Sequence, residues 1–102
     1  MNEAELVFSE ILDCSRISLY EKRESKLKNS QCLEVASILK RRLSGEPIQY
    51  IFNKTEFMGL EFGLSRDVFI PRPETEILVE RALALAQGHL GLEILDLGTG
   101  SG

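Results

Sequence analysis

The feature that most limits how this chain can fold is an apolar run that leads directly into closely spaced glycines. Residues 92–97 read Leu-Glu-Ile-Leu-Asp-Leu, and Gly98-Thr99-Gly100-Ser101-Gly102 follow. A short apolar run bounded by glycines is typical of a buried strand followed by a turn. In open α/β sheets, ligands lie beyond the carboxyl ends of the strands. We therefore predict a strand over residues 92–97 and a ligand-binding loop over residues 98–102.

The spacing of these glycines separates two classes of cofactor. A dinucleotide-binding loop has the pattern G-x-G-x-x-G and directs a helix N-terminus at a pyrophosphate. Here the glycines alternate as G-x-G-x-G, and Asp96 lies two residues before Gly98. That alternation is the pattern of methyltransferases that use S-adenosylmethionine, a ligand without phosphate whose positive sulfonium suits a nearby acidic residue. Glycine backbone can approach such a ligand closely because it has no Cβ. A nucleotide site or a purely structural turn is the alternative.

Composition and charge exclude several other classes of protein. The 102 residues are 43% hydrophobic, which is enough for one small core or two unfinished ones. The net charge of -4 argues against a general binder of nucleic acids or anionic membranes. No apolar run approaches the roughly 20 residues that span a bilayer, and no signal-peptide apolar region follows the N-terminus. We expect a cytoplasmic protein, a monomer, with no direct nucleic-acid or membrane partner.

The first 45 residues show the periodicity of amphipathic helices. Asn2 followed by Glu5 resembles a capping box at the start of a first helix. A short helical turn is expected over residues 17–20, and a charged loop over residues 21–28. Asn29 or Ser30 is the expected N-cap of the next helix, which Gly45 and Pro47 end. The expected buried stripes are Ala4, Val7, Phe8, Ile11 and Leu12 in the first helix, and Cys32, Val35, Ala36, Leu39 and Leu43 in the second.

Two groups of side chains in these helices have a structural and a functional interpretation. Cys14 and Cys32 fall on apolar helix sides and, with His89 as the one histidine, indicate reduced core thiols and no metal site. Residues 40–42, Lys-Arg-Arg, lie in a last helical turn, where cations complement the helix dipole. The alternative for the basic residues is a docking patch for an acidic partner or ribosomal RNA.

The pattern changes after residue 47. Residues 48–52 are β-prone, and residues 68–70 are predicted to form a short strand. Residues 56–58 and 60–64 flank Gly59 as a predicted hairpin. Pro73 is well placed as the first residue of a helix that Gly88 ends, and His89 is expected to be a solvated cap. The expected buried face of this helix consists of Leu78, Val79, Ala82, Leu83 and Ala86.

The chain therefore divides into three predicted parts. Residues 1–45 form an all-helical N-terminal domain, residues 46–70 a β-hairpin connector, and residues 71–102 the first helix and strand of an α/β domain. The fold class is α followed by α/β.

Three sequence strings in the second half are more specific than the glycine loop. They are Gly-Glu-Pro-Ile-Gln-Tyr-Ile over residues 45–51, Glu-Phe-x-Gly-Leu-x-Phe over residues 56–62, and Ile-Pro-Arg-Pro-Glu-Thr-Glu over residues 70–76. Together with the glycine loop, and in this order, they resemble the release-factor N5-glutamine methyltransferases of the PrmC/HemK type. The first half resembles that family only as a pattern of helices.

The resemblance implies a two-domain enzyme. Its helical N-terminal domain helps to dock the protein substrate, and its seven-stranded, class I Rossmann-like domain binds S-adenosylmethionine. The family methylates the side-chain amide nitrogen of the glutamine in the Gly-Gly-Gln motif of peptide chain release factors, which are the implied partners. Residues carried over by position as lining the cofactor are Gly98, Thr99, Gly100, Ser101 and Gly102. Asp96 would support the loop, and the segment 71–76 would cover the pocket edge, with Arg72 or Thr75 as residues that could reach it.

The sequence also departs from the family. Asn53 stands where glycine is usual, although asparagine tolerates positive φ, and Phe69 replaces a usual leucine. The catalytic Asn-Pro-Pro-Tyr of the family does not occur among these residues, whose prolines are Pro47, Pro71 and Pro73. In the family that asparagine and a nearby carbonyl orient the amide, a form of catalysis by positioning. We therefore expect no catalytic residue in this chain and no activity from these 102 residues alone.

Other interpretations of the sequence stay open at this point. The target could be the glutamine of a ribosomal protein, or the residues could form a non-catalytic helical interaction or folding module. For Arg72, Glu74 and Glu76, a structural account is also available, because acidic residues in a first helical turn complement the dipole and can pair with arginine.

Overall fold

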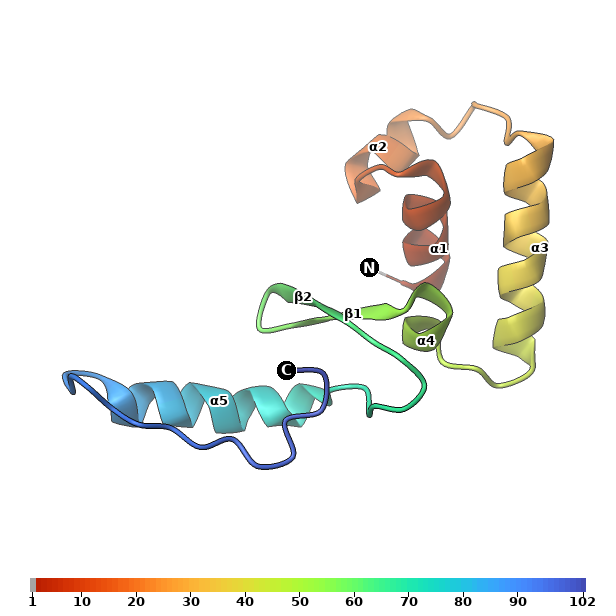
Figure 1. The fold of residues 1–102 in the computed structure, drawn as a ribbon. Helices are drawn as coiled ribbons and strands as arrows, with labels where there is room; N and C mark the ends of the chain where they lie inside the picture. The colour runs from red at the N-terminus through yellow and green to blue at the C-terminus, as the bar shows by residue number, and fades with distance from the viewer. Residues whose placement is uncertain (1) are drawn as a thin grey trace. The chain divides into compact units, whose positions relative to one another are not determined.

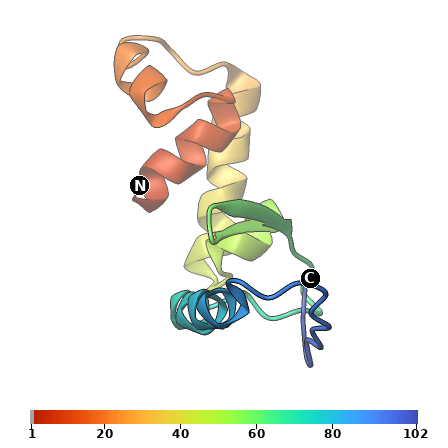
Figure 2. The ribbon, with the colours of Figure 1, turned by 90° about the vertical axis from the view of Figure 1, so that its left-hand side faces the viewer.

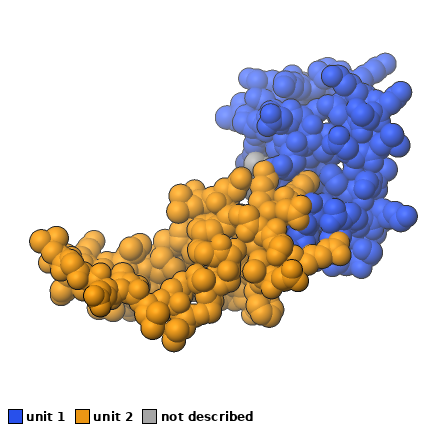
Figure 3. Space-filling view, in the orientation of Figure 1, with its two compact units in different colours: residues 1–51 blue, residues 52–102 orange. Residues whose placement is uncertain are grey.

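The computed structural model describes residues 2–102, which form two compact units, Met1–Ile51 and Phe52–Gly102 (Figure 3). The first unit is helical, and the second contains an antiparallel hairpin and one long helix (Figure 1). The elements are α1 (Glu3–Leu12), α2 (Arg16–Glu21), α3 (Asn29–Leu43), α4 (Ile48–Phe52), β1 (Lys54–Phe57), β2 (Leu60–Gly63) and α5 (Pro73–Ala86).

The first unit is built around α1, which packs against both α2 and α3 (Figures 1 and 2). The predicted capping box is confirmed. The Glu5 N–H donates to Asn2 Oδ1 at 2.8 Å, and the Asn2 N–H donates to Glu5 Oε2 at 3.3 Å. The short helical turn predicted around residue 19 is also present, as α2, and Ser15 caps it through its hydroxyl.

The long helix α3 begins one residue earlier than predicted. Its N-cap is Lys28, and Asn29 is already helical. Lysine has no side-chain acceptor, so the capping contact comes from the other direction, with the Lys28 N–H donating to Gln31 Oε1 at 2.8 Å. The predicted end is confirmed, because Gly45 has φ +94 and Pro47 follows two residues later.

The predicted buried face of α3 is largely wrong. Val35 is half-buried as expected, but Cys32, Ala36, Leu39 and Leu43 are exposed, and the other half-buried residues are Gln31, Ile38 and Arg41. The helix is turned so that its inner side includes polar side chains that cap the helix or form ion pairs. The expectation of two core thiols therefore fails for Cys32, whereas Cys14 is half-buried, and both are free cysteines. In α1, only Ala4 of the expected stripe is exposed.

Residues 48–52, which are β-prone, form a helix instead of a strand. Pro47 provides the first acceptor, because its carbonyl receives the N–H groups of Tyr50 at 3.0 Å and Ile51 at 3.2 Å. Ile48 and Ile51 are 5% and 7% exposed and are spaced by three residues. A helix places such a pair on one face, whereas a strand would direct the two side chains to opposite faces.

The predicted hairpin is confirmed. In the antiparallel register, Lys54 pairs with Gly63, and Phe57 with Leu60. Met58 and Gly59 connect the strands with φ values of +53 and +75, the signature of a type I′ turn. Asn53 also has the positive φ expected for it, +55, and its carbonyl accepts from the Leu64 N–H at 2.8 Å.

The strand expected over residues 68–70 is absent, and this expectation is wrong. Ser65 starts a turn instead, in which its carbonyl accepts from the Val68 N–H and its hydroxyl accepts from the Asp67 N–H, both at 3.3 Å. The side chain of Phe69 is 92% exposed. Local side-chain and backbone bonds of this kind compete with a strand.

Helix α5 forms where it is predicted, with Pro73 in its first turn and a C-terminal reversal at Gly88, where φ is +77. Its expected buried face is mostly wrong, because Val79 and Ala86 are half-buried but Leu78, Ala82 and Leu83 are exposed. After Gly88 the chain reverses direction and runs back toward the start of the helix (Figure 1).

The strand predicted over residues 92–97 is also absent, and the chain there is irregular. A strand needs a neighbour whose backbone groups complete its hydrogen bonds, and among residues 2–102 the sheet contains β1 and β2 alone. Ile94, Leu95 and Leu97 are each more than 80% exposed. Of the expected α/β part, the described residues therefore show the helix but not the strand.

Candidate functional site

The glycine loop adopts left-handed backbone conformations, although the strand predicted before it is missing. Gly98, Gly100 and Gly102 all have positive φ, at +72, +67 and +114. The Gly102 N–H donates to the Thr99 carbonyl at 3.4 Å and closes a turn over residues 99–102. Ser101 is half-buried and the rest of the loop is exposed. Residues with side chains rarely adopt this series of left-handed conformations, so the three glycines are needed for the shape of the loop.

The space beside each of the three glycines is open. A Cβ built on any of the three glycines meets no atom within 4 Å. The protein therefore does not itself fill the space that the missing side chains leave. Gly98, Thr99, Gly100, Ser101 and Gly102 can present backbone to a ligand there, and Asp96 contributes an exposed carboxylate nearby.

The segment 71–76 begins α5, and the two residues expected to reach the pocket are both exposed on it. Arg72 is the N-cap, with extended backbone and no side-chain capping bond. The Thr75 N–H donates to the Arg72 carbonyl at 3.0 Å, which closes the first turn of the helix. Within residues 2–102, no hydrogen bond or ion pair joins Arg72 or Thr75 to the glycine loop. The structure thus places the two segments in one unit without bringing these side chains to the loop.

A contact that the sequence did not suggest joins the same segment to the hairpin. The backbone N–H of Met58, at the tip of the hairpin, donates to Glu76 Oε1 at 3.0 Å. The two residues are 18 positions apart, and neither the hairpin pattern nor the helix periodicity relates them. Glu76 is half-buried, whereas Glu74 in the same helical turn is exposed.

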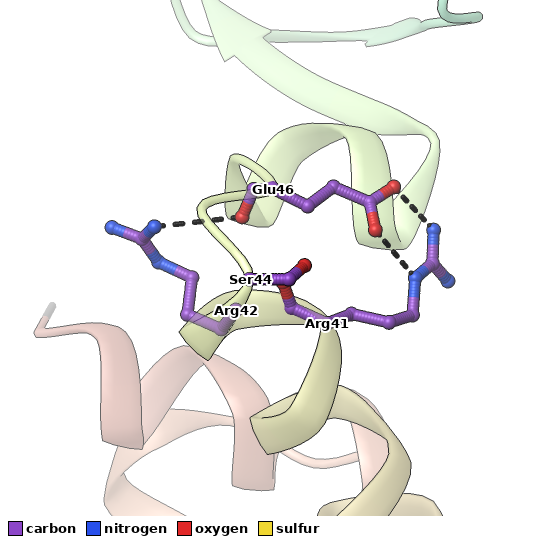
Figure 4. A network of polar contacts seen from close by, with 4 residues as sticks. All are labelled: Arg41, Arg42, Ser44 and Glu46. Atoms are coloured by element: carbon purple, nitrogen blue, oxygen red, sulfur yellow. Dashed lines mark hydrogen bonds and ion pairs between the residues drawn. The ribbon is translucent and has the colours of Figure 1, made fainter.

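The basic residues that end α3 bind partners within their own unit (Figure 4). Arg41 forms a bidentate pair with Glu46, with Nε to Oε2 at 2.8 Å and Nη2 to Oε1 at 2.6 Å. This hydrogen-bonded carboxylate raises the pKa of Arg41. The Ser44 hydroxyl donates to the Arg41 carbonyl at 2.6 Å. Both the side chain and the carbonyl of Arg41 therefore stabilise the turn after α3.

Arg42 connects the same turn to the start of α1. Its guanidinium donates to both oxygens of Glu3 at 3.1–3.3 Å, and Nη1 donates to the Glu46 carbonyl at 3.5 Å. The hydrogen bond from Arg42 lowers the pKa of Glu3. These contacts favour the structural interpretation of the basic stretch over a docking patch, because two of its three cations already bind carboxylates.

A second polar cluster lies around Glu5, the buried charged residue of α1, which is 8% exposed. The Tyr20 hydroxyl donates to Glu5 Oε1 at 2.7 Å, and Arg16 Nε approaches Oε2 at 3.0 Å. The bond from Tyr20, with those from Asn2 and Arg16, lowers the pKa of the Glu5 carboxyl despite its burial. The sequence predicted the capping role of Glu5 but not this second role, in which it holds α2 against α1.

None of the helices within residues 2–102 combines the length and apolar character that crossing a bilayer requires. No group of three or more histidine, cysteine, aspartate or glutamate side chains is arranged there to hold a metal ion.

Comparisons with a family model and with known proteins point to the same family. Residues 1–52 match the family model of the PrmC N-terminal domain. The release factor glutamine methyltransferase of Buchnera aphidicola subsp. Schizaphis graminum is 44% identical over 100 residues, which cover 98% of this chain and 36% of the relative. That of Coxiella burnetii is 46% identical over 100 residues, with the same coverage. That of Koribacter versatilis is 43% identical over 99 residues, 97% of this chain and 35% of the relative.

The chain spans little more than a third of the length of these relatives. The family match ends at residue 52, next to the boundary between the two compact units after Ile51. The matched region is therefore the helical unit. From the family model and the relatives together, the chain belongs to the release factor glutamine methyltransferase family, and its first 52 residues are the PrmC N-terminal domain.

Proposed function

We propose that this sequence is part of a cytoplasmic enzyme that transfers a methyl group from S-adenosylmethionine to a glutamine side chain. The target is the amide nitrogen of the glutamine in the Gly-Gly-Gln motif of peptide chain release factors. The relatives carry the name of that activity over an alignment that covers nearly all of this chain. Within the proposal, residues 1–45 dock the protein substrate, and residues 71–102 begin the cofactor-binding domain. Residues 46–70 form the connector between these two parts.

The observation that carries the proposal is the series of three left-handed glycines in the loop. S-adenosylmethionine supplies the methyl group when bound. Gly98, Thr99, Gly100, Ser101 and Gly102 would hold it against the main chain, and Asp96 would support the loop. Arg72 and Thr75 would lie at the edge of that site, on the first turn of α5.

The 102 residues alone should not catalyse the reaction. An amide nitrogen is a poor nucleophile because its lone pair is delocalised, so the reaction depends on holding the amide in line with the donor methyl group. Orientation of this kind can supply a large part of a rate enhancement. The family does this with Asn-Pro-Pro-Tyr, which this sequence does not contain.

A methylation assay tests the activity directly. The full-length protein that contains this sequence would be incubated with S-adenosylmethionine and a purified release factor, and the Gly-Gly-Gln peptide would be analysed by mass spectrometry. We expect one added methyl group on the glutamine. A parallel reaction with ribosomal proteins distinguishes the alternative target, and modification of a ribosomal protein alone would overturn the choice of substrate.

Calorimetry on the 102-residue chain tests the second part of the proposal. We expect weak or no binding of S-adenosylmethionine, because the loop is exposed and follows an irregular segment instead of a strand. Tight binding would show that these residues already form a complete cofactor site, and would contradict the assignment of the remaining contacts to other parts of the enzyme.

A non-catalytic role for the helical unit alone has one observation in its favour. The compact unit Met1–Ile51 coincides with the family match over residues 1–52. Limited proteolysis of the chain, followed by mass spectrometry, tests it. A resistant fragment that ends near residue 52 would show an independently folding module, and early cleavage within α1 or α3 would exclude one.

A further inference from the structure

The tip of the hairpin has an unusual first residue for its type of turn. A type I′ turn requires positive φ at both central positions, which glycine, asparagine and aspartate adopt readily. Met58 occupies the first of them with φ +53. An unbranched apolar side chain in this conformation costs conformational energy, so other contacts must hold the turn in place.

One such contact comes from outside the hairpin. The Met58 N–H donates to Glu76 Oε1 at 3.0 Å, in a partly buried position. In a two-residue hairpin this N–H points away from the strand ladder, so its acceptor must come from elsewhere. Hydrogen bonds to a charged group are stronger than those between neutral groups. The carboxylate therefore favours the conformation that the Met58 side chain opposes.

The hairpin that donates this hydrogen bond has further contacts between its two strands. Phe57 and Phe62 pack edge to face, with ring centroids 6.2 Å apart and an interplanar angle of 79°. Lys54 Nζ lies 3.6 Å from Glu61 Oε2 across the strands. Two cross-strand contacts thus support the hairpin, and its tip is hydrogen-bonded to Glu76 of α5.

Glu76 belongs to the stiff segment at the start of α5. Pro71 and Pro73 have fixed φ, and the Thr75 N–H bond to the Arg72 carbonyl closes the first helical turn. A constraint at Glu76 therefore acts on the segment 71–76 as a whole.

We propose that Glu76 is a positioning residue. Its carboxylate ties the hairpin tip to the first turn of α5, and so holds the segment 71–76 at the edge of the S-adenosylmethionine site. The second half of this statement rests on the proposed function, and the first half does not. Glu74, in the same turn but exposed, is the matched control.

Amide hydrogen exchange in the isotope-labelled 102-residue chain tests the tie. In Glu76→Ala, Met58 should exchange faster by on the order of tenfold, and its amide proton resonance should move upfield. Glu76→Gln keeps an acceptor oxygen and should recover part of the protection of the Met58 amide. In Glu74→Ala, that amide should exchange at the same rate as in the parent chain. The Leu64 amide, bonded to the Asn53 carbonyl, reports whether the hairpin itself survives.

Two results would overturn the tie: Met58 exchange that does not respond to Glu76→Ala, or a loss of protection at Leu64 as large as that at Met58. The first would mean that the bond does not form, and the second that Glu76 supports the hairpin generally.

The functional half is tested in the full-length protein by measuring S-adenosylmethionine binding. Glu76→Ala should weaken it several-fold relative to the parent enzyme, and Glu76→Gln should recover part of the loss. Unchanged affinity in Glu76→Ala would overturn the positioning role. If the parent enzyme binds no S-adenosylmethionine, the proposed function and the positioning role of Glu76 both fail. The exchange rate of the Met58 amide still shows whether Glu76 bonds to the hairpin tip.

Discussion

The units Met1–Ile51 and Phe52–Gly102 are equal in length, but they differ in how many of their predicted elements make contacts within the unit. In the first unit, ion pairs connect different helices, Arg42 of α3 with Glu3 of α1 and Arg16 of α2 with Glu5 of α1. In the second unit, the hairpin and α5 form, but the apolar residues after Gly88 are exposed to solvent. Leu90 is fully exposed, and Leu95 is 81% exposed.

The difference follows from how helices and strands satisfy their backbones. A helix completes its hydrogen bonds within one segment, so α5 forms even though its apolar side chains are largely exposed. A strand depends on a second strand for the same bonds. The hairpin contains both of its strands within ten residues, 54–63, whereas residues 92–97 have no partner strand within the described chain. Local sequence is therefore sufficient for the helices and the hairpin, and insufficient for the last predicted strand.

The largest expected effect is loss of the buried isoleucine in α4. Ile48→Ala removes a side chain that is 5% exposed, and we expect a loss of about 2–3 kcal/mol in the free energy of unfolding. Leu95→Ala is the matched change in the second unit and should alter it by less than about 0.5 kcal/mol. Urea unfolding followed by circular dichroism measures both. Equal losses would mean that the two regions are equally packed, and the comparison would fail.

The next effect concerns the buried carboxylate of Glu5 and its dependence on pH. Glu5→Gln should lower the unfolding midpoint at neutral pH, because it removes the charge that Tyr20 and Arg16 bind. The pKa of Glu5 is lower in the folded state than in the unfolded chain. Its contribution to stability is therefore complete above the ordinary glutamate value of about 4.3, and it is lost as the pH falls through the folded-state pKa.

Glu34→Gln, an exposed change on α3, is the control for that experiment. Unfolding midpoints would be measured from neutral pH down to acid. The difference between Glu5→Gln and the parent chain should shrink as the pH falls through this range, and the Glu34→Gln curve should stay parallel to the parent curve. A difference that is constant with pH would show that Glu5 acts through packing instead of charge.

A third change separates folding from ligand binding in the second unit. Gly98→Ala forces a side chain into a left-handed conformation, with φ +72, but its Cβ meets nothing within 4 Å. In the 102-residue chain we expect a loss of no more than about 1 kcal/mol, since the loop is exposed. In the full-length protein, binding of S-adenosylmethionine should weaken roughly tenfold or more, because strain and the added methyl group act on the site itself. Calorimetry measures the affinity, and a normal affinity would exclude this loop as the cofactor site.

Much of the local structure could be predicted from the sequence, and the errors share a cause. The capping box at Asn2, the hairpin turn at Gly59 and the helix start at Pro73 depend on neighbouring residues, and all are confirmed. The expected buried faces of α3 and α5 depend on what packs against each helix, and most of the residues predicted for them are exposed. For residues 48–52, β-propensity favours a strand, whereas the three-residue spacing of Ile48 and Ile51 fits the helix that the structure contains.

The candidate site divides in the same way. Residue type permits the positive φ that Gly98, Gly100 and Gly102 have in the structure. The bond from the Met58 N–H to Glu76 depends on the hairpin and α5 meeting in space, 18 residues apart. No periodicity or motif in a single sequence encodes such a meeting, so only the structure could show it.

The smallest expected effect tests whether the hairpin is the self-sufficient part of the second unit. Its register places Glu56 directly opposite Glu61, and both side chains are exposed. Like charges across a strand pair are destabilising, and Lys54 offsets this only in part from the neighbouring position, 3.6 Å from Glu61. Glu56→Lys should therefore stabilise the hairpin by about 0.3 kcal/mol, measured by hydrogen exchange at Leu64, whose amide closes the ladder. Because this residue pair lies entirely within the hairpin, the gain should persist when Glu76 is changed to alanine. If it disappears in that background, the hairpin depends on α5 for its structure, and the distinction between elements that local sequence can form and those that need a partner would have to be redrawn.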